Sequence, residues 1–232
     1  FLRRVAAAPE CPKSSCPSPE RYMEMYHCDA EHVYAVTLSA ELSGSYNSAE
    51  LGKNLYKEEY GEKQIHVFNS KSASVGETLI ALKIAECEEK QMSFEEIIKT
   101  VDAYIEEQHT YFVLETLETL KKNGRLTGIK AMMATALNIK PVMGSTPIGS
   151  ICQLGQGRGM KKAIEKMVAQ VKKDAIRPEE KILAITHCNC PERAEDMKKM
   201  VQEQMKVKDI IVLDTAGISS MYAADGGVIL VV

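Results

Sequence analysis

The stretch "HVYAVTLSAELSGSYNSAE", residues 32–50, decides the first part of the fold. Residues 32–38 are β-branched, aromatic and apolar, and so predict a buried strand. Residues 46–60, "YNSAELGKNLYKEEY", predict a helix. Between strand and helix the chain places a group of hydroxyl side chains, which can serve turn and cap chemistry, a hydrolase nucleophile, or a cradle for an anion. The group comprises Ser39, Ser43, Ser45 and Ser48.

The same order of elements recurs downstream. "QIHVFNS" (64–70) predicts a second strand, "SKSASVG" (70–76) is another serine-rich turn, and "ETLIALKIAECEEK" (77–90) predicts a helix. Ser93 and Glu96 then form a capping box for a further helix. Strands that alternate with helices predict a parallel sheet, here in a three-layer α/β/α domain over residues 1–108. Ligands of such domains bind at the carboxyl ends of the strands, where these serines lie.

After residue 108 the pattern changes. Strands are predicted within residues 110–117, as a pair around a turn in 139–155, and in 181–186, 209–214 and 226–232. Helices are predicted over residues 160–173, which carry an apolar stripe, and 191–205, where Pro191 suits a first turn. Hairpins mixed with crossovers predict a second α/β domain, residues 109–232, with a mixed sheet of about six strands covered by helices.

Composition narrows the class of protein. The chain has 232 residues and a net charge of −3, with basic and acidic residues interspersed, which disfavours nucleic-acid binding. The longest late apolar run, "GGVILVV", is far shorter than the roughly 20 residues of a membrane-spanning helix. We therefore expect no stable membrane insertion. Phe1 in place of a start methionine suggests that the chain begins partway into its gene product.

The cysteines favour a reducing, cytoplasmic location. There are seven, an odd number, spread through apolar or helical surroundings, unlike a secreted disulfide framework. The segment "HCNC", residues 187–190, raises the question of zinc. Zinc sites pair such spacings with a second cluster, and neighbouring residues of a strand point to opposite faces. We therefore expect no metal site.

Two groups of serines are candidates for binding an anion. Ser43, Gly44 and Ser45 lie between a strand and a helix, so helix-start N–H groups and hydroxyls can converge on one anion. The alternative is that one serine caps the helix and the others are solvated. Ser14 and Ser15 form a second pair, and they are free for another role because Ser18 already suits the cap of the following helix.

An enzymatic alternative remains open at this point. A serine-dependent hydrolase or acyltransferase, acting on a lipid-like ester, would use Ser43 as nucleophile. The surroundings of Ser43 lack a G-x-S-x-G pattern, and none of the five histidines is placed so as to stand out as its base. No G-x-x-x-x-G-K-[ST] sequence occurs, which argues against a P-loop nucleotide site. We expect a protein without catalytic residues or a cofactor.

Five segments in order carry a resemblance to a known family. They are "LSGSYNSAE", "ETLETLKKNGRLTG", "ALNIKPVMG", "GQGRGMKKAIEKM" and "GISSMYAADGGVILVV". Together they resemble the DegV family of fatty-acid-binding proteins. The resemblance implies a two-domain carrier that encloses one long-chain fatty acid and presents its carboxyl group to a separate fatty-acid kinase in bacteria that possess one.

The resemblance also implies roles for single residues. Ser14 and Ser15 match a Thr-Ser pair of the family, Ser43 matches its "LSG" serine, and Arg125 matches the arginine of a Gly-Gly-Arg segment. Asn123 replaces the first glycine of that segment, where asparagine tolerates a left-handed backbone. Tyr222 stands where some members carry a histidine near the carboxyl group. Candidate residues for the apolar tunnel, for which ordinary core packing is the alternative, are Met132, Met133, Ala136 and Leu137.

Physical chemistry agrees with a serine-rich site. Burying an acyl chain contributes roughly 0.8 kcal/mol per methylene, or on the order of 12 kcal/mol for about fifteen, before the costs of binding. The carboxylate would cost several kcal/mol if buried without donors. Clustered serine hydroxyls and helix-start N–H groups supply such donors. The sequence thus predicts a fatty-acid ligand whose carboxylate is held by serines.

Overall fold

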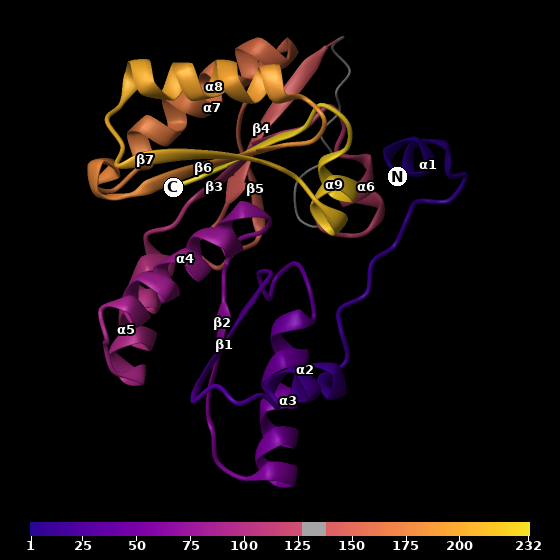
Figure 1. Ribbon diagram of the computed structural model, residues 1–232. Coiled ribbons are helices and arrows are strands. Elements are labelled where there is room, and N and C mark those ends of the chain that lie inside the picture. The colour runs from indigo at the N-terminus through magenta and orange to yellow at the C-terminus, as the bar shows by residue number, and fades with distance from the viewer. Residues whose placement is uncertain (127–137) are drawn as a thin grey trace.

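The computed structural model describes residues 1–126 and 138–232, which form two β-sheets with helices around them (Figure 1). The first sheet pairs two parallel strands, β1 (His32–Thr37) and β2 (Gln64–Asn69). The second is mixed, in the order β5-β4-β3-β8-β6-β7. Its strands are β3 (Thr110–Val113), β4 (Ile139–Ser145), β5 (Ile151–Arg158), β6 (Ile182–His187), β7 (Asp209–Asp214) and β8 (Val228–Val231). The predicted fold class, a parallel sheet followed by a mixed sheet of about six strands, is confirmed.

Alternation along β1 and β2 builds three layers. Ile65 and Val67 pack on one face against α2 (Pro19–Tyr26) and α3 (Ser45–Tyr60). Phe68, on the other face, packs against α4 (Val75–Glu89) and α5 (Phe94–Glu106). Because successive strand residues point to opposite faces, a strand with apolar residues on both faces needs cover on both sides. The predicted three-layer arrangement of the first domain is thereby confirmed.

The helix starts follow the predicted capping chemistry. The Ser18 side chain accepts a hydrogen bond from the Arg21 N–H at the start of α2. Ser93 and Glu96 form a complete capping box at α5. On the inner side of α5, Ile97, Val101 and Ile105 are buried, as helical spacing requires, and each contributes about 1.5–3 kcal/mol.

The second sheet also has two covered faces. Leu183, Ile185 and Leu230 point to a core beneath α7 (Gly159–Asp174) and α8 (Pro191–Gln204). Ala184 and Val231 alternate with them and meet Val75 and Leu79 of α4. Helix α4 therefore packs against both sheets. The predicted boundary between residues 108 and 109 lies in the segment that joins α5 to β3, and it stays a prediction.

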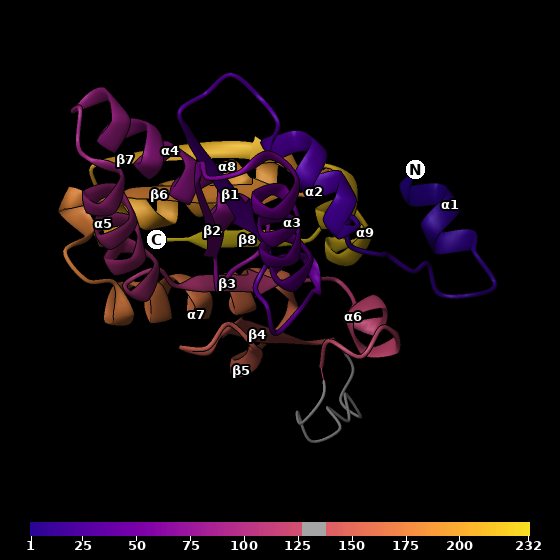
Figure 2. The same ribbon diagram turned by 90° about the horizontal axis from the view of Figure 1, so that it is seen from below.

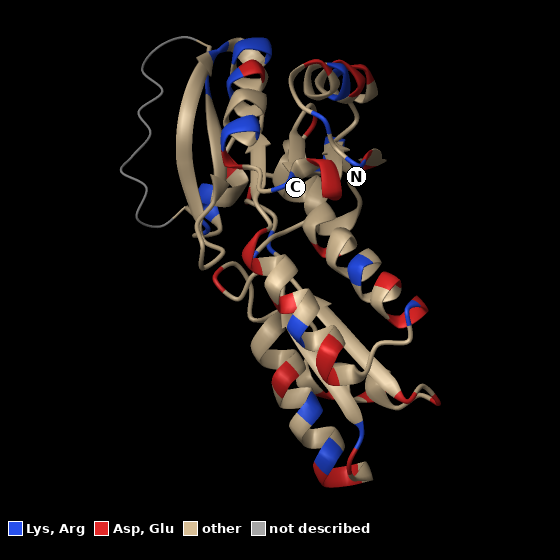
Figure 3. Ribbon diagram, turned by 90° about the vertical axis from the view of Figure 1, so that its left-hand side faces the viewer, with Lys and Arg blue, Asp and Glu red and all other residues tan. Residues whose placement is uncertain are grey.

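Three short helices and one turn complete the described part of the chain. Helix α1 lies beside α9, and an extended segment leads from it to α2 (Figure 2). Along the longer helices, Lys and Arg alternate with Asp and Glu (Figure 3). Within residues 1–126 and 138–232, no helix combines the length and apolar character that a bilayer crossing requires. The short elements are α1 (Leu2–Ala7), α6 (Glu118–Lys122), α9 (Gly217–Ala223) and the 3₁₀ turn η1 (Pro178–Glu180).

Candidate functional site

A cavity of about 750 Å³ lies where the carboxyl ends of β1 and β2 face the mixed sheet. Its size is within the usual range for small-molecule sites. Both sheets, the N-terminal loop, α3, α4 and α9 contribute to its wall. The seven ligand-binding candidates from the sequence all line it, although they come from four separate segments. They are Ser14, Ser15, Ser43, Gly44, Ser45, Arg125 and Tyr222.

The mixed sheet supplies an apolar wall to the cavity. Phe112 of β3 lies opposite Ile229 of β8 in the strand register, and both line the cavity. Their neighbours Tyr111 and Leu230 belong to the core on the other face. Alternation along the strands therefore directs Phe112 and Ile229 into the cavity. Further apolar lining residues are Val36, Leu38, Leu42, Leu114, Leu120, Ile151 and Ala223.

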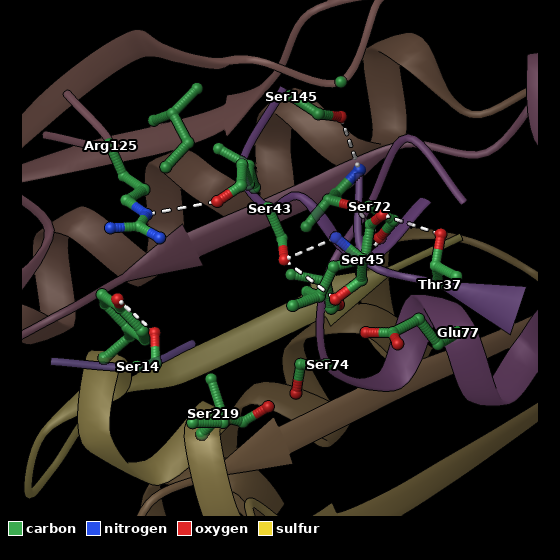
Figure 4. A pocket seen from close by; sticks show the side chains of 18 of the residues that line it. Ser14, Thr37, Ser43, Ser45, Ser72, Ser74, Glu77, Arg125, Ser145 and Ser219 are labelled. Atoms are coloured by element: carbon green, nitrogen blue, oxygen red, sulfur yellow. Dashed lines mark hydrogen bonds between the residues drawn. The ribbon is translucent and has the colours of Figure 1, made fainter. Parts of the chain in front are cut away.

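The serines after β1 form a compact polar group at the start of α3 (Figure 4). Ser43 Oγ and Ser45 Oγ are hydrogen-bonded at 2.9 Å, and the Ser45 N–H donates to Ser43 Oγ at 3.2 Å. Gly44 is the N-cap residue and has no side chain to accept the next N–H groups. Ser43 thus takes over part of the capping role, while two hydroxyls and the first helical N–H groups remain at the cavity wall.

Three distant segments meet at another part of the wall. Ser14 Oγ and Tyr222 Oη are hydrogen-bonded at 3.0 Å. The Arg125 guanidinium lies 5.8 Å from the centre of the Tyr222 ring. Its Nε donates to the Leu42 carbonyl at 3.2 Å, which joins Arg125 to the loop that carries Ser43. The fold therefore brings Arg125, Tyr222 and Ser14 together, while Ser15 lines the cavity as an exposed residue.

The turn before Arg125 differs from the sequence prediction. Asn123 does not adopt the left-handed backbone, because its φ is −91°. Gly124 does so instead, with φ +75°. The Asn123 side chain donates to the Pro12 carbonyl at 2.9 Å, so it ties the N-terminal loop to this turn. The tunnel candidates Met132, Met133, Ala136 and Leu137 lie outside the described residues.

Sequence reasoning missed a second polar group in the same cavity. Its signal was the turn "SKSASVG", whose serines follow β2 as Ser43 and Ser45 follow β1. Ser72 Oγ and Thr110 Oγ1 are hydrogen-bonded at 2.5 Å, and the Thr110 N–H donates to Ser145 Oγ at 3.2 Å. The further lining residues of this kind are Ser74, Glu77, Ser150 and Ser219.

Glu77 is the carboxyl group that the described residues contribute to this wall. Burial raises its pKa to about 7, and the backbone of Ser74 at the helix start acts in the opposite direction. Tyr22, also in the lining, has a raised pKa because of burial, which a hydrogen bond with Ser45 opposes. The cavity thus holds an acid that titrates near neutral pH.

The described residues give no support to metal or triad chemistry. Within residues 1–126 and 138–232, no three His, Cys, Asp or Glu side chains gather as a metal site would require. In the "HCNC" segment, His187 Nδ1 accepts the Cys190 N–H at 3.3 Å and lies 3.4 Å from Asp214 Oδ1. No histidine appears among the described residues of the cavity wall, so Ser43 has no imidazole base there.

Comparison with known proteins identifies the family. A family model described as "Uncharacterised protein, DegV family" matches residues 1–231. The chain belongs to the DegV family. A DegV domain-containing protein of Streptococcus pneumoniae is 32% identical over 230 residues, which cover 99% of this chain and 81% of that protein.

Solved DegV structures share the fold and hold fatty acids. A DegV-family protein from Ruminococcus gnavus, whose crystal structure contains vaccenic acid, is 65% identical, with a TM-score of 0.98 over 100% of this chain and 82% of that one. The Streptococcus pneumoniae Fatty Acid Kinase (Fak) B3 protein, loaded with linoleic acid, is 31% identical, with a TM-score of 0.90 over 99% and 81% of the two chains. A DegV-family protein from Eubacterium eligens, loaded with heptadecanoic acid, is 27% identical, with a TM-score of 0.90 over 99% of this chain and 82% of that one.

Proposed function

We propose that this DegV-family protein binds one long-chain fatty acid in its cavity. The proposal rests on one observation. A single cavity of about 750 Å³ combines an apolar wall, which includes Phe112 and Ile229, with two groups of serines. An acyl chain gains roughly 0.8 kcal/mol for each methylene that it buries against such a wall. The fatty acids held by the similar Ruminococcus and Eubacterium proteins support the same ligand class.

The carboxylate lies at the serine group that begins α3. Ser43 and Ser45 provide two hydroxyl donors beside the α3 N-terminus, where the helix dipole favours an anion. Tyr222 and Ser14 add two further hydroxyls, and Arg125 adds positive charge at the same wall. Such donors offset the cost of removing a carboxylate from water. Gly44 leaves the helix start open to the ligand, and Ser15 borders the same loop.

The protein acts as a carrier that performs no catalysis of its own. It holds the fatty acid in the cytoplasm and presents the acyl group to a fatty-acid kinase. The similar Streptococcus protein, which is named for a fatty-acid kinase, supports this second role. A serine hydrolase is the poorer explanation, because Ser43 Oγ is hydrogen-bonded to Ser45 rather than to a base.

Mass spectrometry of the purified protein tests the proposal. Denaturation and solvent extraction should release intact long-chain fatty acid at about one per chain. The delipidated protein should then rebind vaccenate. Ester turnover that Ser43→Ala abolishes would establish the hydrolase instead. Neither a copurifying fatty acid nor rebinding would contradict the carrier function.

A further inference from the structure

Glu77 is the only carboxyl group among the described residues that line the cavity. It lies in the first turn of α4, three residues after the N-cap Ser74. Figure 4 shows its carboxylate directed toward the part of the cavity that Ser45 and Ser74 border. The Glu77 N–H donates to the Ser74 carbonyl at 3.2 Å, so the residue is held in the first turn of the helix. The site thus places an acid beside the serines that would hold a fatty-acid carboxylate.

The charge of Glu77 is poorly compensated. Among the described residues, Glu77 takes part in no ion pair. Among the described lining residues two side chains are cationic, but Lys71 pairs with Glu106, and Arg125 donates to the carbonyls of Leu42 and Asn123. The described lining residues also include one thiol and two phenols, which come from the N-terminal loop, α2 and α9: Cys16, Tyr22 and Tyr222.

A ligand in the cavity would discourage ionisation of Glu77 in two ways. An acyl chain removes water from the carboxylate, and a ligand carboxylate adds a like charge in the same low-dielectric space. Two carboxylates that share a site hold one proton between them, and their titrations become coupled. Both effects act in the same direction, so the result does not depend on which end of the ligand lies nearer to Glu77.

We infer that the cavity takes up its fatty acid together with one proton from solvent, and that Glu77 accepts this proton. The inference rests on the proposed function and assigns a regulatory residue within that site. The fatty acid enters as its anion, Glu77 becomes neutral, and the filled cavity carries one negative charge between the two groups. No covalent bond other than the new O–H bond forms or breaks. Neutral Glu77 can donate this O–H within the cavity while its other oxygen remains an acceptor.

Proton uptake makes retention of the ligand depend on pH. Below about pH 6 the Glu77 carboxyl of the empty protein is already mostly protonated, since its pKa is about 7. Above pH 7 each binding event must draw a proton from solvent, and the affinity falls by up to about tenfold per pH unit. The protein therefore holds its fatty acid more tightly in mildly acid conditions and releases it more readily as the pH rises.

Calorimetric titration with vaccenate measures this proton directly. The delipidated wild type, Glu77→Gln and the matched control Glu89→Gln are titrated at pH 8 in two buffers with different enthalpies of ionisation. The amide in Glu77→Gln has nearly the shape of the carboxyl group but cannot take up the proton, and Glu89 is an exposed acid of the same helix. We expect uptake of about one proton for the wild type and for Glu89→Gln, and nearly none for Glu77→Gln. Protons that the vaccenate carboxyl itself takes up would contribute equally to the uptake measured with all three proteins.

Two results would overturn the inference while the proposed function stands: binding by the wild type without proton uptake, or equal uptake by Glu77→Gln. Absence of vaccenate binding to the wild type at both pH 6 and pH 8 would instead refute the proposed function. If Glu77→Gln does not fold, the wild-type affinity between pH 6 and pH 9 decides the question. A constant affinity over that range would refute the inference, and a fall of about tenfold per pH unit above pH 7 would support it.

Discussion

Ser14 and Tyr222 are 208 positions apart in the sequence, yet Ser14 Oγ and Tyr222 Oη are joined by a hydrogen bond of 3.0 Å. The bond connects the N-terminal loop to α9 at the cavity wall. Arg125 lies over the same phenol ring, so three separate segments meet there. Tyr222 is therefore well placed to serve both the closure of the wall and the binding of a ligand carboxylate.

Replacing Tyr222 by phenylalanine separates these two roles. Tyr222→Phe keeps the ring and removes only the hydroxyl. A hydrogen bond to a charged group contributes about 1.5–3 kcal/mol, so the affinity for vaccenate should fall by about ten- to a hundredfold. Calorimetric titration measures it, with Tyr60→Phe, on the exposed end of α3, as the control. Equal affinities of Tyr222→Phe and wild type would show that the phenol does not touch the headgroup.

A histidine at the same position should add a new pH dependence. Imidazole titrates near pH 6.5, and the charged form binds a carboxylate more strongly. The experiment is best done in the Glu77→Gln background, where the cavity carboxyl no longer titrates. There, Tyr222→His should strengthen vaccenate binding as the pH falls from about 8 to 6. The single variant Glu77→Gln should keep a constant affinity over this range; a constant affinity of the double variant as well would place residue 222 away from the carboxylate.

The sequence predicted the main strands and helices, and a serine-rich edge that the structure places in the cavity wall, because both depend on local pattern. Apolar runs such as residues 64–68 predict strands, and a serine-rich loop after a strand in an α/β domain predicts a polar site at that edge. Glu77 was missed because nothing local distinguishes it from any acid in a first helical turn. Its proposed role follows from its place in the cavity wall, which segments distant in the sequence build together.

Ser43 offers a direct test of the serine cradle. Ser43→Ala removes one hydroxyl that the proposed site offers to the ligand. It also removes the oxygen that accepts the Ser45 N–H. Vaccenate affinity should fall by about ten- to a hundredfold, while the protein should lose only the roughly 0.5–1.5 kcal/mol of stability that one neutral hydrogen bond contributes. Ser48→Ala, on the same helix but outside the cavity lining, should bind as the wild type does. The cradle assignment would be wrong if both variants kept the wild-type affinity.

Glu77 should also make the stability of the empty protein depend on pH. Its folded pKa of about 7 exceeds the ordinary value of 4.5, so folding favours the neutral form. The resulting cost is absent below about pH 4.5, grows as the pH rises to 7, and is complete above it. Glu77→Gln should therefore stabilise the ligand-free protein on the order of 1–3 kcal/mol at pH 8 and little at pH 5. Thermal unfolding at both pH values measures it, and an equal effect at the two would contradict the raised pKa.

Gly149 allows a test of the contact between the loops of the two sheets. It lies in the β4–β5 hairpin with φ +89°, and its carbonyl accepts the Ser39 hydroxyl at 2.8 Å. An added Cβ would overlap Ser39 Oγ and lie only 2.8 Å from Lys71 Cα. Gly61 is a matched control, because its φ is also +89° and a Cβ there would meet nothing within 4 Å.

The two alanine variants should therefore differ by the effect of the contact alone. Both place an alanine at φ +89°, a positive-φ backbone that costs a residue with a Cβ about 1–3 kcal/mol. Only Gly149→Ala should lose a further 1–3 kcal/mol or so, since the loops must move apart to admit the methyl group. Lys71 precedes the cavity residues Ser72 and Ser74, so this movement should also weaken vaccenate binding, whereas Gly61→Ala should leave it unchanged. Urea unfolding and calorimetric titration measure the two effects. Equal losses of stability in the two variants would mean that the hairpin does not press on the loop after β2, and that the cavity is wider at this edge than the distances imply.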